Sequence, residues 1–152
     1  MANPIQEFSG FAISVNCVIF GYTNPDIYVL LIKEEHENAE SWVIPGDGMR
    51  ADEGFKDAAK RLVASLHGNP EVYLRQSMVR GDVHHINKGS LLSAVYYSTV
   101  QKEHFLADDF KKRGDFKWIP LSRLSKENVE PSQIDLIEES YQRLKTHAKS
   151  RP

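Results

Sequence analysis

The stretch WVIPGDGMRADEGFKDAAKRLVASLHG, from Trp42 to Gly68, joins a tight glycine turn, an acidic loop and a helix. The helix is predicted because apolar residues recur at helical spacing and line one face. These residues are Phe55, Ala58, Ala59, Leu62, Val63 and Leu66. Gly68 stands where a helix commonly ends. This order of elements suits a site that holds a metal beside a phosphate, yet no carboxylate occurs from Lys60 to Gly68.

Apolar and β-branched runs predict strands on both sides of this segment. Residues 11–33 predict a strand pair around the turn-forming GYTNPD, and further strands are predicted at EVYLRQSMV, SLLSAVYYSTV and FKWIP. The polar run from Lys33 to Ser41 predicts an exposed loop.

A second helix is predicted near the C-terminus, where Ile134, Ile137, Tyr141 and Leu144 form an apolar stripe. Pro131 and Ser132 supply its start, with Ser132 as the candidate N-cap. Strands that alternate with two helices predict an α+β fold, arranged as an α/β/α sandwich with a mixed sheet.

The chain of 152 residues is long enough for one domain, which we expect over residues 1–152 with a polar, frayed tail from about residue 146. Its formal charge of -2 provides no long-range attraction to nucleic acids or anionic membranes. The single cysteine, Cys17, lies in the apolar run VNCVIF and predicts a buried thiol in a reducing compartment. No segment has the length of a signal peptide or a membrane span, so we expect a soluble, cytoplasmic protein.

The segment from Trp42 to Gly68 resembles the box of the Nudix superfamily, in which a glycine, a glutamate, an arginine followed by helix glutamates, and a final glycine occur at fixed spacing. Aligned without gaps, Asp47 takes the place of the first glycine, Glu53 matches the first glutamate, Arg61 matches the arginine and Gly68 matches the last glycine. The resemblance implies a Nudix-type α/β/α sandwich. The box is degenerate, because the positions of the helix glutamates are Leu62, Ser65 and Leu66.

The missing glutamates determine the expected chemistry. Hydrolysis of a diphosphate needs Mg²⁺ or Mn²⁺, and these hard cations require several oxygen ligands. Leucine has no oxygen ligand and serine has only a neutral hydroxyl. We therefore expect no metal, no cofactor, no catalytic residue and no ordinary Nudix hydrolysis, with Glu53 and Arg61 as the retained box residues.

Both groups of box residues also have structural interpretations. Leu62 and Leu66 can simply extend the core stripe of the helix. Arg61 can form an ion pair with Asp57 or with Glu53, and either contact would be structural.

A closer resemblance covers the chain from Phe11 to Leu144. The runs VNCVIFGY, VLLIK, VYLRQ, SAVYYSTV, KWIPLSRL and LIEESYQRL are similar to the Nudix-like effector domain of bacterial transcriptional regulators of NAD or sugar metabolism. The resemblance implies a homodimer that senses ADP-ribose or a pentose in the former catalytic cleft. Those regulators continue into a winged-helix DNA-binding domain, and this sequence ends where that domain would begin. The near-neutral charge leads us to expect no nucleic acid binding by this chain alone.

Several family positions differ in this sequence, which weakens the prediction of a pyrophosphate ligand. Glu34 replaces an arginine, His85 and Ile86 replace an Arg-Asp pair, and Ser132 and Gln133 replace an Asp-His pair. The candidate ligand-binding residues around the expected cleft are Gln76, Arg80, His84, His85, Lys88 and Tyr96. Each residue can also have a purely structural role. The histidines can be solvated loop residues, and Gln76 and Tyr96 can complete strand hydrogen bonds or packing.

Three functions are consistent with these residues. The first is a sensor or regulatory domain that binds a nucleotide sugar or a sugar without hydrolysing it. The second is an atypical, Mg²⁺-dependent Nudix hydrolase that uses Glu53 with an aspartate and a histidine of the GDVHH loop; the aspartates available are Asp47, Asp52, Asp57 and Asp82. The third is a protein-interaction module whose cleft is filled by Leu62 and Leu66.

Overall fold

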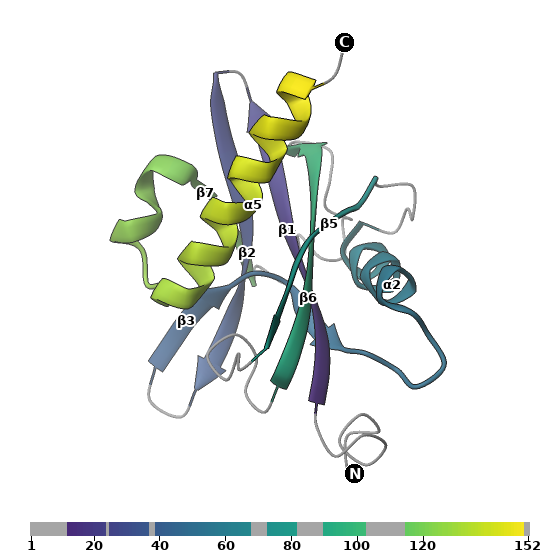
Figure 1. Cartoon of the computed structure of the whole chain (residues 1–152). Helices are drawn as coiled ribbons and strands as arrows, with labels where there is room; N and C mark the ends of the chain where they lie inside the picture. Colours follow the sequence, from purple (N-terminus) through teal and green to yellow (C-terminus); the bar gives the residue numbers. More distant parts are fainter. Residues whose placement is uncertain are drawn as a thin grey trace.

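A mixed β-sheet lies between two helices in the computed structural model of the chain (Figure 1). The structure describes residues 12–23, 25–36, 39–67, 73–81, 90–102 and 115–150. The strands are β1 (Ala12–Thr23), β2 (Asp26–His36), β3 (Ala39–Val43), β4 (Gly46–Gly48), β5 (Arg75–Gly81), β6 (Ser90–Gln101) and β7 (Phe116–Pro120). The helices are α2 (Phe55–His67) and α5 (Pro131–Ser150), and a 3-10 helix, η1, covers Leu121–Lys126.

The sheet is ordered β3-β2-β1-β6-β5, and β4 and β7 pair with β1 and β2. β1 and β6 run parallel, and the other pairs within the described residues are antiparallel. The mixed sheet predicted from the sequence is therefore confirmed.

Side chains alternate between the two faces of the sheet and build a core on each. On β1, Val15, Cys17 and Ile19 contact the cluster that contains α2, whereas Val18 and Phe20 contact the cluster that contains α5. The two helices cover opposite faces (Figure 1), which confirms the α/β/α sandwich. Burial raises the pKa of the Cys17 thiol to about 12, so this thiol is protonated at neutral pH.

The apolar stripe of α2 packs on the sheet as its spacing predicts. Its buried members are at most 8% exposed, and they are Ala58, Ala59, Leu62, Val63 and Leu66. The interpretation of Leu62 and Leu66 as core residues is therefore confirmed. The helix ends at His67, and Gly68 lies outside the described residues.

The segment from Lys33 to Ser41 was predicted to be a loop, and this prediction is wrong for its described residues. β2 continues to His36, and β3 begins at Ala39 and pairs with it. The pairing satisfies backbone hydrogen bonds whatever the side chains are, and polar residues suit a strand at the edge of a sheet.

The start of α5 also differs from the prediction. The helix begins at Pro131, whose fixed φ and missing N–H suit the first helical position, so Ser132 lies within the helix and is not its N-cap. The carbonyl of Glu130 accepts hydrogen bonds from the backbone of Gln133 and Ile134. The helix continues to Ser150. Within the described residues, no helix is both long enough and apolar enough to span a bilayer.

Candidate functional site

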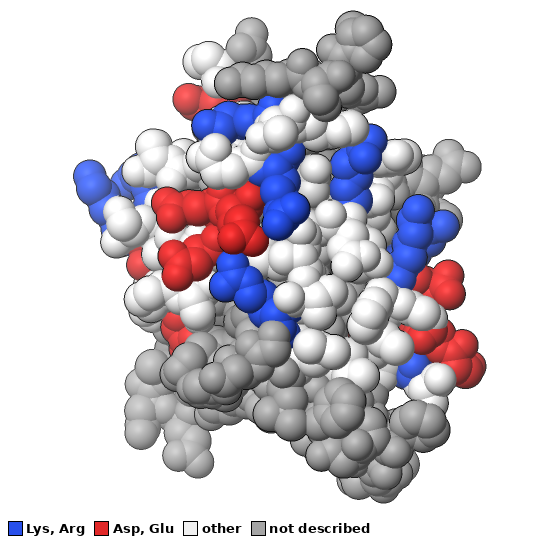
Figure 2. All heavy atoms as spheres, in the orientation of Figure 1, with Lys and Arg blue, Asp and Glu red and all other residues white. Residues whose placement is uncertain are grey.

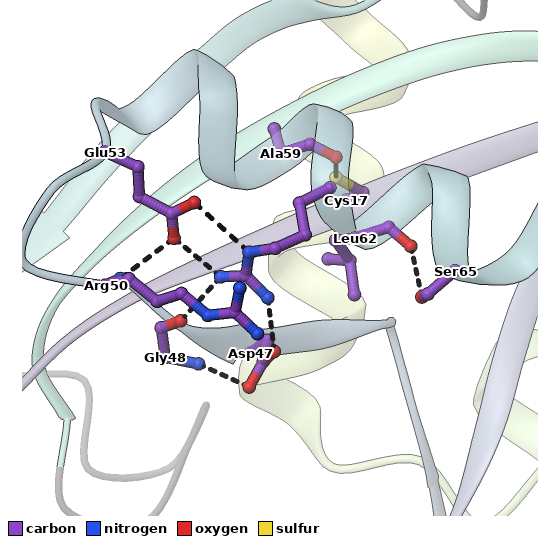
Figure 3. Close-up of polar contacts among 9 residues, drawn as sticks. Cys17, Asp47, Gly48, Arg50, Glu53, Ala59, Leu62 and Ser65 are labelled. Carbon is purple, nitrogen blue, oxygen red and sulfur yellow. Dashed lines mark hydrogen bonds and ion pairs between the residues drawn. The ribbon is translucent and has the colours of Figure 1, made fainter. Parts of the chain in front are cut away.

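Arg61 of α2 holds the loop between β4 and α2 through Asp47, Gly48 and Glu53, which lie near one another in Figure 3. Its Nε donates to Glu53 Oε2 at 3.1 Å and its Nη2 donates to Glu53 Oε1 at 2.6 Å. Nη1 donates to Asp47 Oδ2 at 2.8 Å, and Nη2 also donates to the carbonyl of Gly48 at 3.0 Å. We call this set of contacts the Arg61 clamp. It fixes both ends of the acidic loop to the helix.

Both carboxylate oxygens of Glu53 are engaged in the clamp. Oε1 accepts a further hydrogen bond from the backbone N–H of Arg50 at 2.9 Å, and the side chain is only 13% exposed. The hydrogen bond from Arg61 holds the pKa of Glu53 below its ordinary value, and the carboxylate in turn raises the pKa of Arg61. Of the two partners offered by the sequence, Arg61 contacts Glu53, while Asp57 accepts from the backbone of Gly54 at 3.4 Å.

Because of the clamp, the protein should lose stability as the pH falls through the acidic range. Because the folded pKa of Glu53 is lowered from its ordinary value of 4.5, the unfolded chain binds the proton more readily. We expect this contribution to be complete above pH 4.5 and to be lost as the pH falls through the folded pKa. Urea denaturation at a series of pH values measures the loss. Glu53→Gln should show a flatter decline over the same range, and equal declines for both proteins would contradict the assignment.

Two of the three positions of the missing glutamates, Leu62 and Leu66, do not face solvent, whereas Ser65 is exposed. Leu62 is 8% exposed and Leu66 is 5% exposed, and both pack in the core against the sheet. The hydroxyl of Ser65 donates to the carbonyl of Leu62 at 2.6 Å. Across the described ranges, no group of three or more His, Cys, Asp or Glu side chains is arranged to hold a metal ion.

A cavity of about 270 Å³ remains beside these positions. Its walls are Leu62 and Leu66 of α2, Ile32 and Lys33 of β2, and residues 43–46. The walls are largely apolar, and the volume lies just below the range of about 300–1,000 Å³ that is usual for small-molecule sites. Leu62 and Leu66 thus form part of the wall of a small, largely apolar cavity.

One wall of this cavity is held by the buried Gln133 of α5. Its Oε1 accepts a hydrogen bond from the backbone N–H of Ile44 at 2.8 Å. The next carbonyl, of Pro45, accepts from the backbone N–H of Cys17 at 2.9 Å. Together these contacts fix the turn that leads into β4.

We expect Gln133→Leu to lower the free energy of unfolding by about 2 kcal/mol, because the N–H of Ile44 would be buried without its acceptor. Urea denaturation measures the change. Gln142→Leu, at an exposed position of the same helix, is the control and should change stability by less than about 0.5 kcal/mol. An equal effect of both substitutions would contradict a specific role for Gln133.

The candidate ligand-binding residues are divided between the two faces of the sheet. Tyr96 is buried in the cluster beneath α2, and burial raises the pKa of its hydroxyl. Gln76 is exposed and lies directly opposite Tyr96 in the register of β5 and β6, which places both on the α2 face. Arg80 lies on the α5 face, where its Nη2 contacts Glu139 Oε1 at 3.0 Å. His84, His85 and Lys88 lie outside the described residues.

A β-bulge in β5 explains why Arg80 is separated from Gln76. An even spacing along a regular strand would place both on one face. The register with β6 shifts between Gln76 and Met78, and Ser77 is the additional residue. Ser77 turns toward α5, where its hydroxyl lies 2.9 Å from that of Ser140.

The sequence analysis did not select Lys33, Ile44 or Gln133 as residues of this region. Of these three residues, Gln133 is the one that the sequence pattern could have identified. It lies at helical spacing with the buried Leu136, Ile137 and Ser140, and a polar residue on the apolar face of a helix commonly has a specific partner.

Comparison with known proteins identifies the fold. No protein-family model matches the sequence, and no curated protein sequence matches it. Solved structures of Nudix domains do match. The chain has the Nudix fold, as predicted.

Three of these structures are similar over most of the chain. NrtR from Shewanella oneidensis, solved with a 27mer DNA, has a TM-score of 0.75 at 22% identity, covering 90% of this chain and 63% of that chain. A mutT/nudix family protein from Listeria innocua has a TM-score of 0.73 at 17% identity, covering 92% and 98%. The Nudix domain of S. oneidensis NrtR complexed with ADP ribose has a TM-score of 0.70 at 21% identity, covering 94% of each chain. The present chain thus spans less than two thirds of the NrtR chain in the DNA complex.

Proposed function

We propose that this chain is a Nudix-fold domain that binds a nucleotide sugar of the ADP-ribose type without hydrolysing it, and that it acts as a sensor or regulatory domain. The proposal is supported by what the Nudix-like box keeps and what it lacks. The Arg61 clamp retains the architecture of the loop, whereas Leu62 and Leu66 are packed into the core.

The residues present do not fit the divalent cation of a Nudix hydrolase. Such a cation needs several oxygen ligands in near-octahedral geometry. Glu53 already shares both oxygens with Arg61, and the two leucines provide none. The proposal therefore includes no metal and no catalytic residue.

The ligand is proposed to bind on the α2 face of the sheet. Gln76 and Tyr96 lie opposite each other there, and the Nudix domain of NrtR, which has the same fold, has been solved with ADP ribose. A cytoplasmic homodimer is part of the same proposal, and analytical ultracentrifugation would test the dimer.

We further propose no nucleic acid binding by this chain alone. The formal charge is -2, and on the face seen in Figure 2 acidic and basic side chains of the described residues are interspersed. Such a surface gives no extended attraction to phosphates.

Calorimetric titration of ADP-ribose in the presence of Mg²⁺ tests the proposal. A saturating isotherm without continued heat is the expected result. Sustained heat, with ADP-ribose cleaved in the cell, would overturn it in favour of the atypical hydrolase that uses Glu53 and a nearby aspartate.

Two exposed glutamines provide a matched pair for the same titration. Gln76→Ala should weaken ADP-ribose binding, whereas Gln142→Ala, on α5, should leave it unchanged. Equal binding by both variants would place the ligand away from Gln76.

A protein-interaction module is the second candidate, and the size of the cavity favours it. A volume of about 270 Å³ is small for a nucleotide sugar, and Leu62 and Leu66 form part of its wall. This function predicts that no small ligand raises the melting temperature. A specific ligand at 100 times its dissociation constant would stabilise the fold by about 2.7 kcal/mol.

A further inference from the structure

A larger cavity, of about 530 Å³, lies on the α5 face of the sheet, away from the box. It is formed by the start of β5, the end of β6 and the C-terminal half of α5. Its walls include Tyr73, Arg75, Tyr97, Thr99, Leu144 and His147. This volume falls within the usual range for small organic ligands, about 300–1,000 Å³.

The charged group in this cavity is Arg75. Its guanidinium carbon lies 5.0 Å from the centroid of the Tyr73 ring. Among the residues that the structure describes, no carboxylate lies within 4.0 Å of it, unlike Arg61, Arg80 and Arg143. An arginine held against an aromatic ring presents its remaining donors in a planar fork that matches a phosphate.

The other walls of the cavity are suited to a flat, apolar group. Tyr73 is 72% exposed, so its ring is accessible to a ligand. Tyr97 and Leu144 belong to the apolar cluster beneath α5 and form the inner side. Thr99 adds a hydroxyl, which can donate to or accept from a sugar.

We propose that this cavity binds a heteroaromatic ring linked to a phosphate, a compound of the size of a nucleoside monophosphate. Arg75 contacts the phosphate, and Tyr73 and Tyr97 contact the ring. The site is separate from the one proposed on the α2 face, because Arg75 and Gln76 are neighbours on β5 and point to opposite faces.

An NMR titration with AMP tests this site residue by residue. Amide signals at Tyr73, Arg75, Tyr97, Leu144 and His147 should shift. AMP should bind more tightly than adenosine, which lacks the phosphate, and than ribose 5-phosphate, which lacks the ring. Shifts confined to α2 and its neighbours, or equal binding of all three compounds, would overturn the proposal.

Variants separate the two sites. Arg75→Ala should weaken AMP binding by about tenfold or more, through loss of a charge-assisted hydrogen bond. Tyr73→Phe should retain binding and Tyr73→Ala should weaken it. Gln76→Ala should leave AMP binding at this cavity unchanged, and Arg75→Ala should leave ADP-ribose binding at the α2 face unchanged.

Arg123→Ala, at an exposed arginine of η1, is the charge-matched control. It should bind AMP as the wild type does. If Arg75→Ala and Arg123→Ala weakened AMP binding equally, the effect would come from the loss of any positive charge, and the proposed site would be wrong. Because Arg75 and Tyr73 lie outside the buried core, both variants should fold, and their melting temperatures check this.

Discussion

Leu66→Glu is expected to lower the free energy of unfolding by about 4 kcal/mol at pH 7. The substitution restores a glutamate of the Nudix box, but Leu66 is 5% exposed and packed between α2 and the sheet. The variant loses an apolar contact surface and places a carboxylate where water does not reach. Urea denaturation measures the change.

The pH dependence of this variant follows from the same burial. Burial raises the pKa of the introduced carboxyl, so the ionisation penalty is largest above its folded pKa and decreases as the pH falls below it. We therefore expect the difference between Leu66→Glu and the wild type to be smaller at about pH 5 than at pH 7.

Ser65→Glu is the matched control for Leu66→Glu. It also restores a box glutamate, but Ser65 is exposed, and we expect a change within about 0.5 kcal/mol. If Mg²⁺ instead raised the melting temperature of Leu66→Glu above that of the wild type, the interpretation that this face of α2 is packed in the core would be wrong.

Arg61→Met is expected to lower the free energy of unfolding by about 3 kcal/mol. The substitution keeps an unbranched apolar stem but removes the donors to Glu53, Asp47 and Gly48. Glu53 would then be a poorly solvated carboxylate without its cation, since it is only 13% exposed. Denaturant titration gives the change, and faster amide exchange over residues 48–54 would locate it in the loop.

A double-mutant cycle with Glu53→Gln isolates the contact between Arg61 and Glu53. The two single changes should sum to more than the change in the double variant, because each removes the same interaction. Lys60→Met, at the adjacent exposed cation of α2, should stay within about 0.5 kcal/mol of the wild type. Additive effects in the cycle would contradict a direct clamp.

Much of the fold could be predicted from sequence because its signals are local. The spacing of Ala58, Leu62 and Leu66 identifies both a helix and its buried face, and the continuous apolar runs of β1 and β2 are typical of strands covered on both sides. The edge pairing of β3 with β2 could not be predicted, because polar residues in a strand at the edge of a sheet resemble those of a loop.

The candidate site was harder to predict, because it depends on contacts between distant residues. The bulge at Ser77 places Arg80 on the face opposite Gln76. The sequence pattern of residues 75–80 does not indicate that the strand contains an additional residue. The contact between Gln133 and Ile44 joins positions 89 apart in the chain. The short, fixed spacing of the box, in contrast, offered Glu53 as one of two possible partners for Arg61, and the structure shows this contact.

The parallel pairing of β1 with β6 has a consequence for synthesis on the ribosome. β1 is central in the sheet, yet the partner along one of its edges is not made until residues 90–101 emerge. The contact between Ser14 and Ser93 alone spans 79 positions. Pairings of such high sequence separation form slowly, since a long loop must close first. A nascent chain that has reached α2 but not β6 therefore exposes an apolar strand edge, and it is at this stage that we expect chaperones to engage the protein.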